Sequence, residues 1–299
     1  MLTLSYTQAN LNCYTIKMAA FSKKAYETSC GVNESMKIIR KTVVLLLVIT
    51  FAISAWNVWR ILADYQIGVD NYTDLEKYVS FEGEHPVVEE NIGQTNASNR
   101  NEETIPTDPN DTAVPCVDFE TLSEINPDIV AWIYIEGTDI NYPIVQGNDN
   151  SYYLNHLFDG TKNKAGCLFL DSHIDSSFED MNSVIYGHHL KNGTMFTDLM
   201  EYKKQEFYDE HMRALLLTPT GEYEVLFFSG YVSNTASRAW EIEFSDITFE
   251  EWLLEIIDNS CFESYVMPMA EDRIITLSTC TYEFNDARFV LHGVVQEYE

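Results

Sequence analysis

The sequence predicts a mainly β domain, an eight-stranded barrel or sandwich, that follows a single membrane segment. From about residue 117 onward, short apolar runs rich in β-branched and aromatic residues alternate with turn residues. Eight such runs in fewer than 200 residues are typical of a β-barrel or a β-sandwich. The expected strands are residues 131–136, 140–146, 166–170, 183–187, 214–218, 223–233, 274–280 and 288–296.

Apolar residues at helical spacing predict three helical segments in this domain. The first, residues 119–125, ends before Asn126-Pro127. The second, residues 195–211, and the third, residues 248–258, gather large apolar side chains on one side. The stripe of the third segment consists of Phe249, Trp252, Leu253, Ile256 and Ile257.

The membrane segment is the run TVVLLLVITFAISAWNVW at residues 42–59. It contains eighteen residues without a charge, which is long enough to cross a bilayer. Three basic residues lie within 37–41, and acidic sequence dominates after Arg60, so the positive-inside rule places the N-terminus in the cytoplasm. A cleaved signal peptide is the alternative, but WNVWRILADYQ offers a poor cleavage site. We therefore expect residues 42–60 to be a retained signal anchor of a single-pass cell-membrane protein.

The rest of the chain divides around this anchor. Residues 1–41 form the expected cytoplasmic segment, in which residues 1–35 are either native or an extension from a misassigned start codon. Residues 61–116 form the expected extracellular stalk. Its beginning can continue a helix out of the membrane, whereas residues 83–115 are rich in Glu, Asn, Thr and Pro and cannot bury enough apolar surface to fold alone. The extracellular domain is then residues 117–299.

Charge and cysteine spacing exclude two classes of protein. Residues 64–299 carry 11 basic and 45 acidic side chains, a net charge of -34, which repels nucleic acid and anionic lipid head groups. No two of the six cysteines share a C-x-x-C spacing, so a zinc ribbon is not expected. A domain of this size does not need a disulfide framework either. The isolated thiols therefore require another explanation.

Cys280 is the cysteine with the most distinctive setting. It ends the run ITLSTC and precedes a turn, so its thiol is expected at a strand end, where a substrate can reach it. Arg288 begins the next expected strand, and pairing of the two strands as a hairpin would bring it opposite Cys280. A guanidinium in that place can lower the pKa of a thiol, orient a peptide carbonyl or stabilise an oxyanion.

A cysteine nucleophile needs a proton-transfer partner, and the chain offers seven histidines. His188 and His189 have the best setting because they directly follow the apolar strand SVIYG. Neighbouring residues of a strand point to opposite sides, and spacing alone favours His188 only slightly. His211 is expected in a helix tail and His292 inside a strand, where structural roles are more common.

At these residues the chain resembles a known family, the sortases. T-L-S-T-C at 276–280, followed by an arginine on the next strand, is similar to the family signature. I-Y-G-H-H at 185–189 resembles the family's histidine segment, in which the catalytic histidine directly follows glycine, and this favours His188. Residues 126–160 and the expected helix at 248–258 are similar to class B sortases in particular.

The resemblance implies a closed eight-stranded β-barrel with N-terminal helices and a helix between strands six and seven. It also implies a membrane-anchored cysteine transpeptidase of a Gram-positive-type envelope, which cleaves the C-terminal sorting signal of exported proteins through a thioacyl intermediate. The acyl group would pass to an amine of a cell wall precursor or to a pilin lysine. Cys280 would be the nucleophile, His188 the acid and base, and Arg288 the group that holds the substrate backbone and the oxyanion. Neither a metal nor an organic cofactor would be required.

Three further residues are candidates for substrate binding. Ser278 precedes Cys280 by two positions, so strand alternation puts both side chains on one face. Asn150 and Leu154 match family positions that contact the sorting signal, although loop capping and core packing explain them equally well. Two other functions stay open, a hydrolytic cysteine protease and a binding module without activity. The binding module is expected to have lost the cysteine, histidine or arginine, and all three are present.

Overall fold

The structure is a computed structural model that describes residues 3–81, 115–244 and 247–298. The chain forms two compact units, Met1–Ala63 and Asp64–Glu299. The expected stalk segment 83–115 lies outside the described residues, except for its last residue.

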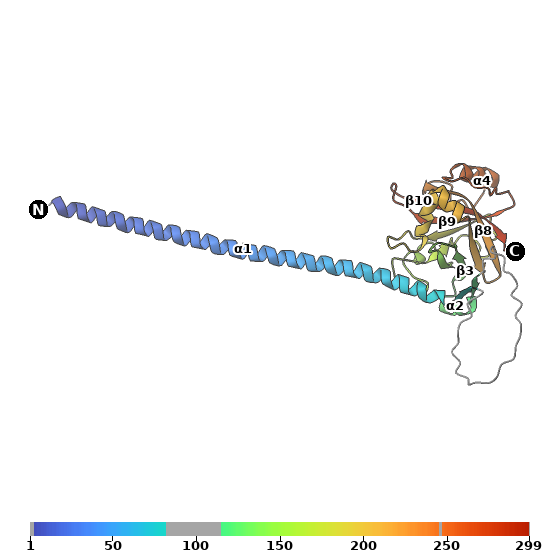
Figure 1. Ribbon diagram of the computed structural model, residues 1–299, viewed down its shortest axis with the longest axis horizontal. Coiled ribbons are helices and arrows are strands. Elements are labelled where there is room, and N and C mark those ends of the chain that lie inside the picture. The colour runs from blue at the N-terminus through green and yellow to red at the C-terminus, as the bar shows by residue number, and fades with distance from the viewer. Residues whose placement is uncertain (1–2, 82–114, 245–246, 299) are drawn as a thin grey trace, which may run out of the picture. The chain divides into compact units, whose positions relative to one another are not determined.

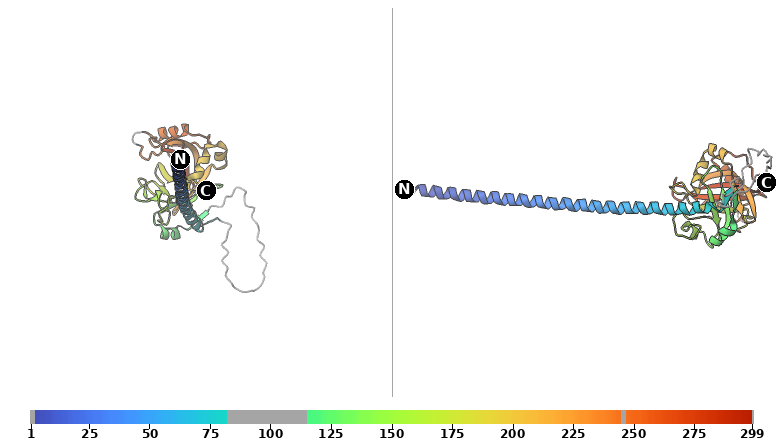
Figure 2. Two further views of the ribbon diagram at one scale, coloured as in Figure 1. Left: turned by 90° about the vertical axis from the view of Figure 1, so that its left-hand side faces the viewer. Right: turned by 60° about the horizontal axis from the view of Figure 1, so that its bottom comes forward.

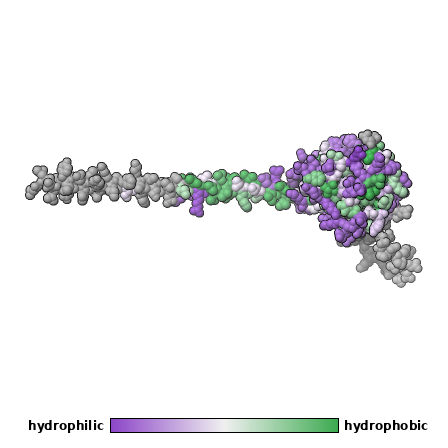
Figure 3. Space-filling view, turned by 90° about the horizontal axis from the view of Figure 1, so that it is seen from above, coloured by the Kyte–Doolittle hydropathy of each residue, from purple (hydrophilic) through white to green (hydrophobic). Residues whose placement is uncertain are grey.

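The N-terminal unit belongs to one long helix, α1 (Thr3–Glu76). Its portion Met36–Glu76 is long and apolar enough to cross a membrane. The side chains of the predicted membrane segment are exposed along the helix, including Leu47, Phe51 and Trp56. Figure 3 shows them as an apolar band. Lipid can cover such a surface, so the helix is a candidate membrane anchor.

The second unit contains a closed barrel of eight strands, as the resemblance predicted (Figure 1). The order around the barrel is β10-β8-β7-β3-β4-β5-β6-β9. The β4–β5 and β6–β9 pairs are parallel and the other six are antiparallel. Each expected strand is present: β3 (Ile129–Tyr134), β4 (Asn141–Val145), β5 (Leu168–Leu170), β6 (Asn182–Gly187), β7 (Arg213–Thr218), β8 (Gly221–Asn234), β9 (Arg273–Cys280) and β10 (Ala287–Glu297).

Two of the three expected helices form as predicted. Helix α2 (Phe119–Ile125) starts at Asp118, whose carboxylate accepts a hydrogen bond from the Thr121 backbone N–H. Helix α4 (Phe249–Asp258) starts at a capping box between Thr248 and Glu251, which satisfies two backbone donors of its first turn. It lies between the sixth and seventh barrel strands, β8 and β9, as predicted.

The third expected helix, at residues 195–211, is instead two short pieces. The first is a 3₁₀ helix, η2 (Phe196–Lys203), and the second is α3 (Gln205–Glu210), with extended backbone at Lys204 between them. Phe196, Leu199 and Tyr202 are buried at a spacing of three residues, which matches the 3₁₀ period rather than the α period. A further 3₁₀ turn, η1 (Tyr152–Leu154), follows β4.

Apolar side chains pack on both sides of the barrel wall. The interior holds large buried residues such as Phe227 and Phe289. Outside, helix α4 lies beside the barrel strands (Figure 1). Its apolar stripe, predicted from the sequence, packs on β8, β9 and β10, with Trp252 fully buried. Burying each such side chain contributes about 1.5–3 kcal/mol. Helix α4 is therefore fixed to the strands that carry the candidate site.

The last turns of α1 pack against the barrel as well. Tyr72 and Leu75 are buried, and the short strands β1 (Val79–Phe81) and β2 (Pro115–Val117) pair beside them (Figure 2). The predicted domain boundaries stay predictions, but residues 64–81, which we assigned to the stalk, belong to the compact unit of the barrel. Among residues 64–80 only Gly68, Tyr72 and Leu75 are buried, which is too few to give the segment a recognisable apolar pattern.

Candidate active site

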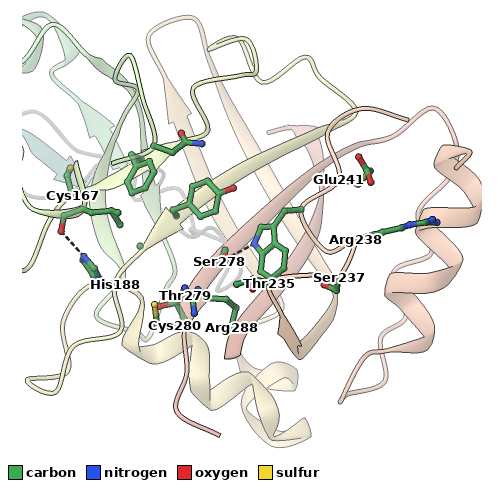
Figure 4. A pocket seen from close by; sticks show the side chains of 16 residues that line it. Cys167, His188, Thr235, Ser237, Arg238, Glu241, Ser278, Thr279, Cys280 and Arg288 are labelled. Carbon is green, nitrogen blue, oxygen red and sulfur yellow. Dashed lines mark hydrogen bonds between the residues drawn. The ribbon is translucent and has the colours of Figure 1, made fainter. Parts of the chain in front are cut away.

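A pocket of about 470 Å³ opens at one rim of the barrel, and all six predicted site residues line it (Figure 4). They come from four parts of the fold: the segment after β4, the residue after β6, the end of β9 and the start of β10. In Figure 4 the Cys280 sulfur lies between the His188 ring and Arg288. The six residues are Asn150, Leu154, His188, Ser278, Cys280 and Arg288.

Cys280 and Arg288 face each other across the β9–β10 hairpin, as the sequence predicted. They are direct partners in the antiparallel register. The Arg288 Nη1 donates a hydrogen bond to the Ala287 carbonyl at 3.0 Å, which turns the guanidinium along the rim. Cys280 is half-buried, so a peptide can reach its sulfur. The pair can therefore act on one carbonyl group.

His188 reaches the same rim because β6 and β9 run parallel. Gly187 pairs with Thr279, so the next residue of each strand, His188 and Cys280, emerges at the same level. The His188 Nε2 lies 2.8 Å from the Leu154 carbonyl oxygen. A carbonyl can only accept, so Nε2 carries the proton and Nδ1 is left to exchange a proton with a substrate.

The contacts of the two neighbouring histidines differ, and only His188 lines the pocket. The His189 Nδ1 lies 3.1 Å from the Cys280 carbonyl oxygen, and its ring packs against Tyr282. His189 therefore supports the backbone beside the thiol and does not line the pocket. Gly187 is needed here because an added Cβ would clash with the Leu168 Cδ2 atom.

A sequence profile described as the sortase domain matches residues 133–296 of the chain. The chain belongs to the sortase family. Sortase B of Listeria monocytogenes is 38% identical over 179 residues, which cover 59% of this chain and 73% of that protein. The Staphylococcus aureus sortase B–substrate complex has a TM-score of 0.57 and 34% identity, over 60% of this chain and 85% of that one. The structure of a sortase B complexed with triglycine has a TM-score of 0.57 and 34% identity, over 60% of this chain and 86% of that one.

These similarities confirm the predicted class B resemblance and the barrel fold, and this sortase is a cysteine transpeptidase. The binding-module alternative and a purely hydrolytic role are not favoured. In the part of the chain that the structure describes, no three His, Cys, Asp or Glu side chains gather into a metal site. The expectation that no metal or cofactor is needed stays a prediction.

The three predicted substrate-binding residues differ in what they can still bind. The Ser278 Oγ accepts a hydrogen bond from Trp240 Nε1 at 2.8 Å and keeps its own O–H to donate. The Asn150 amide donates to Asp171 and accepts from the Ser172 backbone, so it holds the loop together. Leu154 leaves 37% of its surface exposed at the pocket, while its carbonyl holds His188.

Asp171 anchors the loop that Asn150 holds. Burial alone would raise the pKa of this carboxyl, but hydrogen bonds from His173, Asn150 and Tyr186 outweigh it and lower the pKa below its ordinary value. Asp171 is therefore held in its charged form and accepts a hydrogen bond from Tyr186, which lines the cavity. The loop that contains Asn150 is therefore held by a carboxylate that stays ionised.

Sequence reasoning missed one wall of the pocket. The segment after β8 contributes five lining residues, Thr235, Ser237, Arg238, Trp240 and Glu241. This wall is fixed from outside, because Trp252 Nε1 donates to the Arg238 carbonyl at 2.7 Å and Asn182 Nδ2 donates to the Glu241 carbonyl at 2.9 Å. The segment has no strand or helix periodicity, and its only signal was its position before the apolar stripe of α4.

Proposed function

We propose that this sortase uses Cys280, His188 and Arg288 to cut the C-terminal sorting signal of an exported protein and to join the new acyl end to an amine. The observation that supports this most directly is the meeting of the three residues at one pocket rim, with Arg288 paired to Cys280 and His188 level with it. A thiol, an imidazole and a guanidinium are the groups that acyl transfer through a thioester needs.

In the first half of the reaction, the Cys280 thiolate, whose proton is held by His188 Nδ1, attacks the carbonyl carbon of the residue before the scissile bond. Arg288 stabilises the oxyanion of the tetrahedral intermediate. His188 donates its proton to the leaving nitrogen, the C–N bond breaks, and a thioacyl-enzyme remains. The remainder of the signal leaves as a free amine.

In the second half, an incoming amine attacks the thioacyl carbonyl. His188 takes the proton from the amine nitrogen, the C–S bond breaks, and Cys280 leaves as the thiolate. A thioester suits this step because it remains reactive toward amines while it keeps the energy of the cleaved bond. Each cycle therefore exchanges one peptide bond for another without net oxidation or hydrolysis.

Similar proteins support the two kinds of partner. The Staphylococcus aureus relative has been solved with a substrate, and a sortase B has been solved with triglycine, whose terminal amine is a possible acceptor. We extend both to this chain as a sorting-signal peptide and an amine of a cell wall precursor, with a pilin lysine as the alternative acceptor. Ser278 and Leu154 offer a hydroxyl donor and an apolar surface to the peptide, and Asn150 shapes the loop beside them.

We also propose a location for the enzyme. The apolar stretch of α1 is a candidate anchor, and the basic residues at 37–41 favour a cytoplasmic N-terminus with the barrel outside the cell. An extracellular site agrees with a substrate that is exported and with an acceptor in the wall. Protease digestion of intact cells tests this, because an extracellular barrel is cut while the N-terminal segment is protected.

The experiment for the activity uses the full chain in detergent micelles. Fluorogenic peptides with Asn-Pro-x-Thr or x-Pro-x-Thr-Gly signals are incubated with and without triglycine, or with a lysine peptide, and the products are identified by mass spectrometry. We expect an amine conjugate that is absent from Cys280→Ala. Formation of the hydrolysis product alone in every mixture would contradict transfer, and full turnover by Cys280→Ala would remove Cys280 from the mechanism.

A further inference from the structure

The last turns of α1 contact one short segment of the barrel at three points. The Asp64 carbonyl accepts a hydrogen bond from Asn163 Nδ2 at 2.8 Å. Four residues later, a Cβ added at Gly68 would lie 3.2 Å from the Ala165 Cβ, so the helix backbone lies directly on Ala165. Another four residues on, the Tyr72 hydroxyl donates to the Gly166 carbonyl at 2.5 Å. This spacing of four residues puts all three contacts on one face of the helix.

Gly166 also lies against the candidate catalytic histidine. A Cβ added at Gly166 would lie 3.1 Å from the His188 Cδ2 atom and 3.1 Å from the Leu154 carbonyl oxygen. That same oxygen accepts the hydrogen bond from His188 Nε2. The Gly166 backbone has φ +63° and packs so closely here that a side chain would meet the Tyr153 carbonyl at 2.5 Å. Gly166 thus contacts both the helix and the histidine.

We propose that Tyr72 is a positioning residue for His188, acting through the Gly166 carbonyl. The inference rests on the proposed role of His188 as the acid and base of the reaction. Tyr72 is 6% exposed and packs edge-to-face on Tyr142, so its hydroxyl has a fixed direction. It holds the Gly166 peptide against the ring edge and against the carbonyl that orients the ring.

Loss of the hydroxyl has a defined structural effect. The Gly166 carbonyl loses its buried donor, and an unsatisfied buried carbonyl costs free energy, which favours a shift of the Gly166 peptide toward another donor. Movement of Gly166 opens space beside the His188 ring and disturbs the Leu154 carbonyl at the same time. Proton transfer depends on geometry, and a displacement of about 1 Å can cost up to ~10²-fold in rate. Binding of the peptide to the other walls of the pocket is unaffected.

The three helix contacts lie outside the sequence that identifies the family. The sortase profile starts at residue 133, whereas Asp64, Gly68 and Tyr72 belong to a helix that the sequence placed in the stalk. A fragment cut at the predicted boundary of 116/117 would therefore keep all catalytic groups and lose the hydroxyl that holds Gly166.

The test compares Tyr72→Phe with Tyr208→Phe in the full chain in detergent micelles. Tyr208 is an equally buried phenol whose hydroxyl donates to the Phe227 carbonyl at 3.1 Å, and it does not line the pocket. Cleavage of the fluorogenic peptides is measured per reactive Cys280. We expect kcat of Tyr72→Phe to fall about tenfold or more with KM changed less than about twofold, and Tyr208→Phe to keep its kcat.

A second readout does not depend on the peptide. The rate at which iodoacetamide alkylates Cys280 is followed against pH by mass spectrometry of the Cys280 peptide. Displacement of His188 moves the midpoint of this profile from the wild-type value toward that of His188→Ala, whereas a general loss of stability does not. Gly68→Leu, which lifts the helix from Ala165 while favouring the helix itself, is expected to give the same two changes.

The outcomes separate this inference from the proposed function. If His188→Ala keeps full activity and the wild-type alkylation profile, the proposed role of His188 fails. If His188→Ala is inactive while Tyr72→Phe and Gly68→Leu both keep the wild-type kcat and profile, the positioning role of Tyr72 is overturned and the function stands. An equal loss of kcat in Tyr72→Phe and Tyr208→Phe, in proportion to their loss of melting temperature, would also overturn it.

Discussion

Gly187→Ala tests whether the residue before His188 must be glycine. An added Cβ would clash with the Leu168 Cδ2 and lie 2.5 Å from the Phe196 Cδ2. Both neighbours are fully buried, so the methyl group overpacks the site and costs about 1–3 kcal/mol. For a unit of this size, each kcal/mol lowers the melting temperature by about 2–4 °C. Gly187 is the last residue of β6, and the strain is relieved most easily by moving that strand end together with His188.

The assay measures the melting temperature by differential scanning fluorimetry and kcat with the fluorogenic peptides. We expect both to fall, with kcat lower by about tenfold or more because the imidazole moves. Gly221→Ala is the matched control, since its nearest neighbour is the free end of Tyr223, 3.2 Å away, and it does not line the pocket. A Gly187→Ala variant with the wild-type melting temperature and the wild-type kcat would refute this reasoning.

Three more predictions follow from buried polar contacts. Trp240→Phe removes the donor to Ser278 at the pocket wall, so peptide KM is expected to rise about threefold to tenfold in steady-state kinetics with kcat little changed; an unchanged KM would contradict this. Thr276→Val leaves Asn182 and His292 without the hydroxyl between them and is expected to cost about 1–3 kcal/mol in urea unfolding; a loss below about 0.5 kcal/mol would count against it. Burial lowers the pKa of His292 from 6.5 to about 3, so below pH 6.5 the unfolded chain binds a proton that the native protein does not. Between pH 7.5 and pH 5, wild type should therefore lose about 2 kcal/mol more than His292→Gln in urea unfolding, and parallel pH curves would exclude this.

Strands and the hairpin pair were predictable because both depend on local pattern. The eight apolar runs are bounded by turn residues, and each run became a strand within a few residues of its expected ends. Cys280 and Arg288 are separated by a short turn, so the pairing of their strands followed from the hairpin alone. The apolar stripe of α4 was predictable for the same reason, because helical spacing within one short segment identifies it, and its side chains are buried against the barrel.

Features that depend on distant packing were not predictable in this way. The 195–211 segment has the composition of one helix, yet burial of every third residue in η2 favours a 3₁₀ helix there. The pocket wall at 235–241 is irregular and is held by Trp252 and Asn182, which no sequence spacing connects to it. The contact of Tyr72 with Gly166 depends on one hydroxyl and joins residues far apart in the chain, so the composition of neither segment predicts it.

The position of His188 illustrates the difference best. Family resemblance chose it over His189, but the physical reason is the direction of two strands. Because β6 and β9 are parallel neighbours, both leave the barrel at the same rim, and the pair Gly187–Thr279 sets His188 and Cys280 at one level. Arg288 comes back from the antiparallel β10 at that level too. A shift of β6 by one residue would turn the histidine to the other face and put His189 in its place, so the parallel register of β6 on β9 is what selects the proposed proton-transfer group.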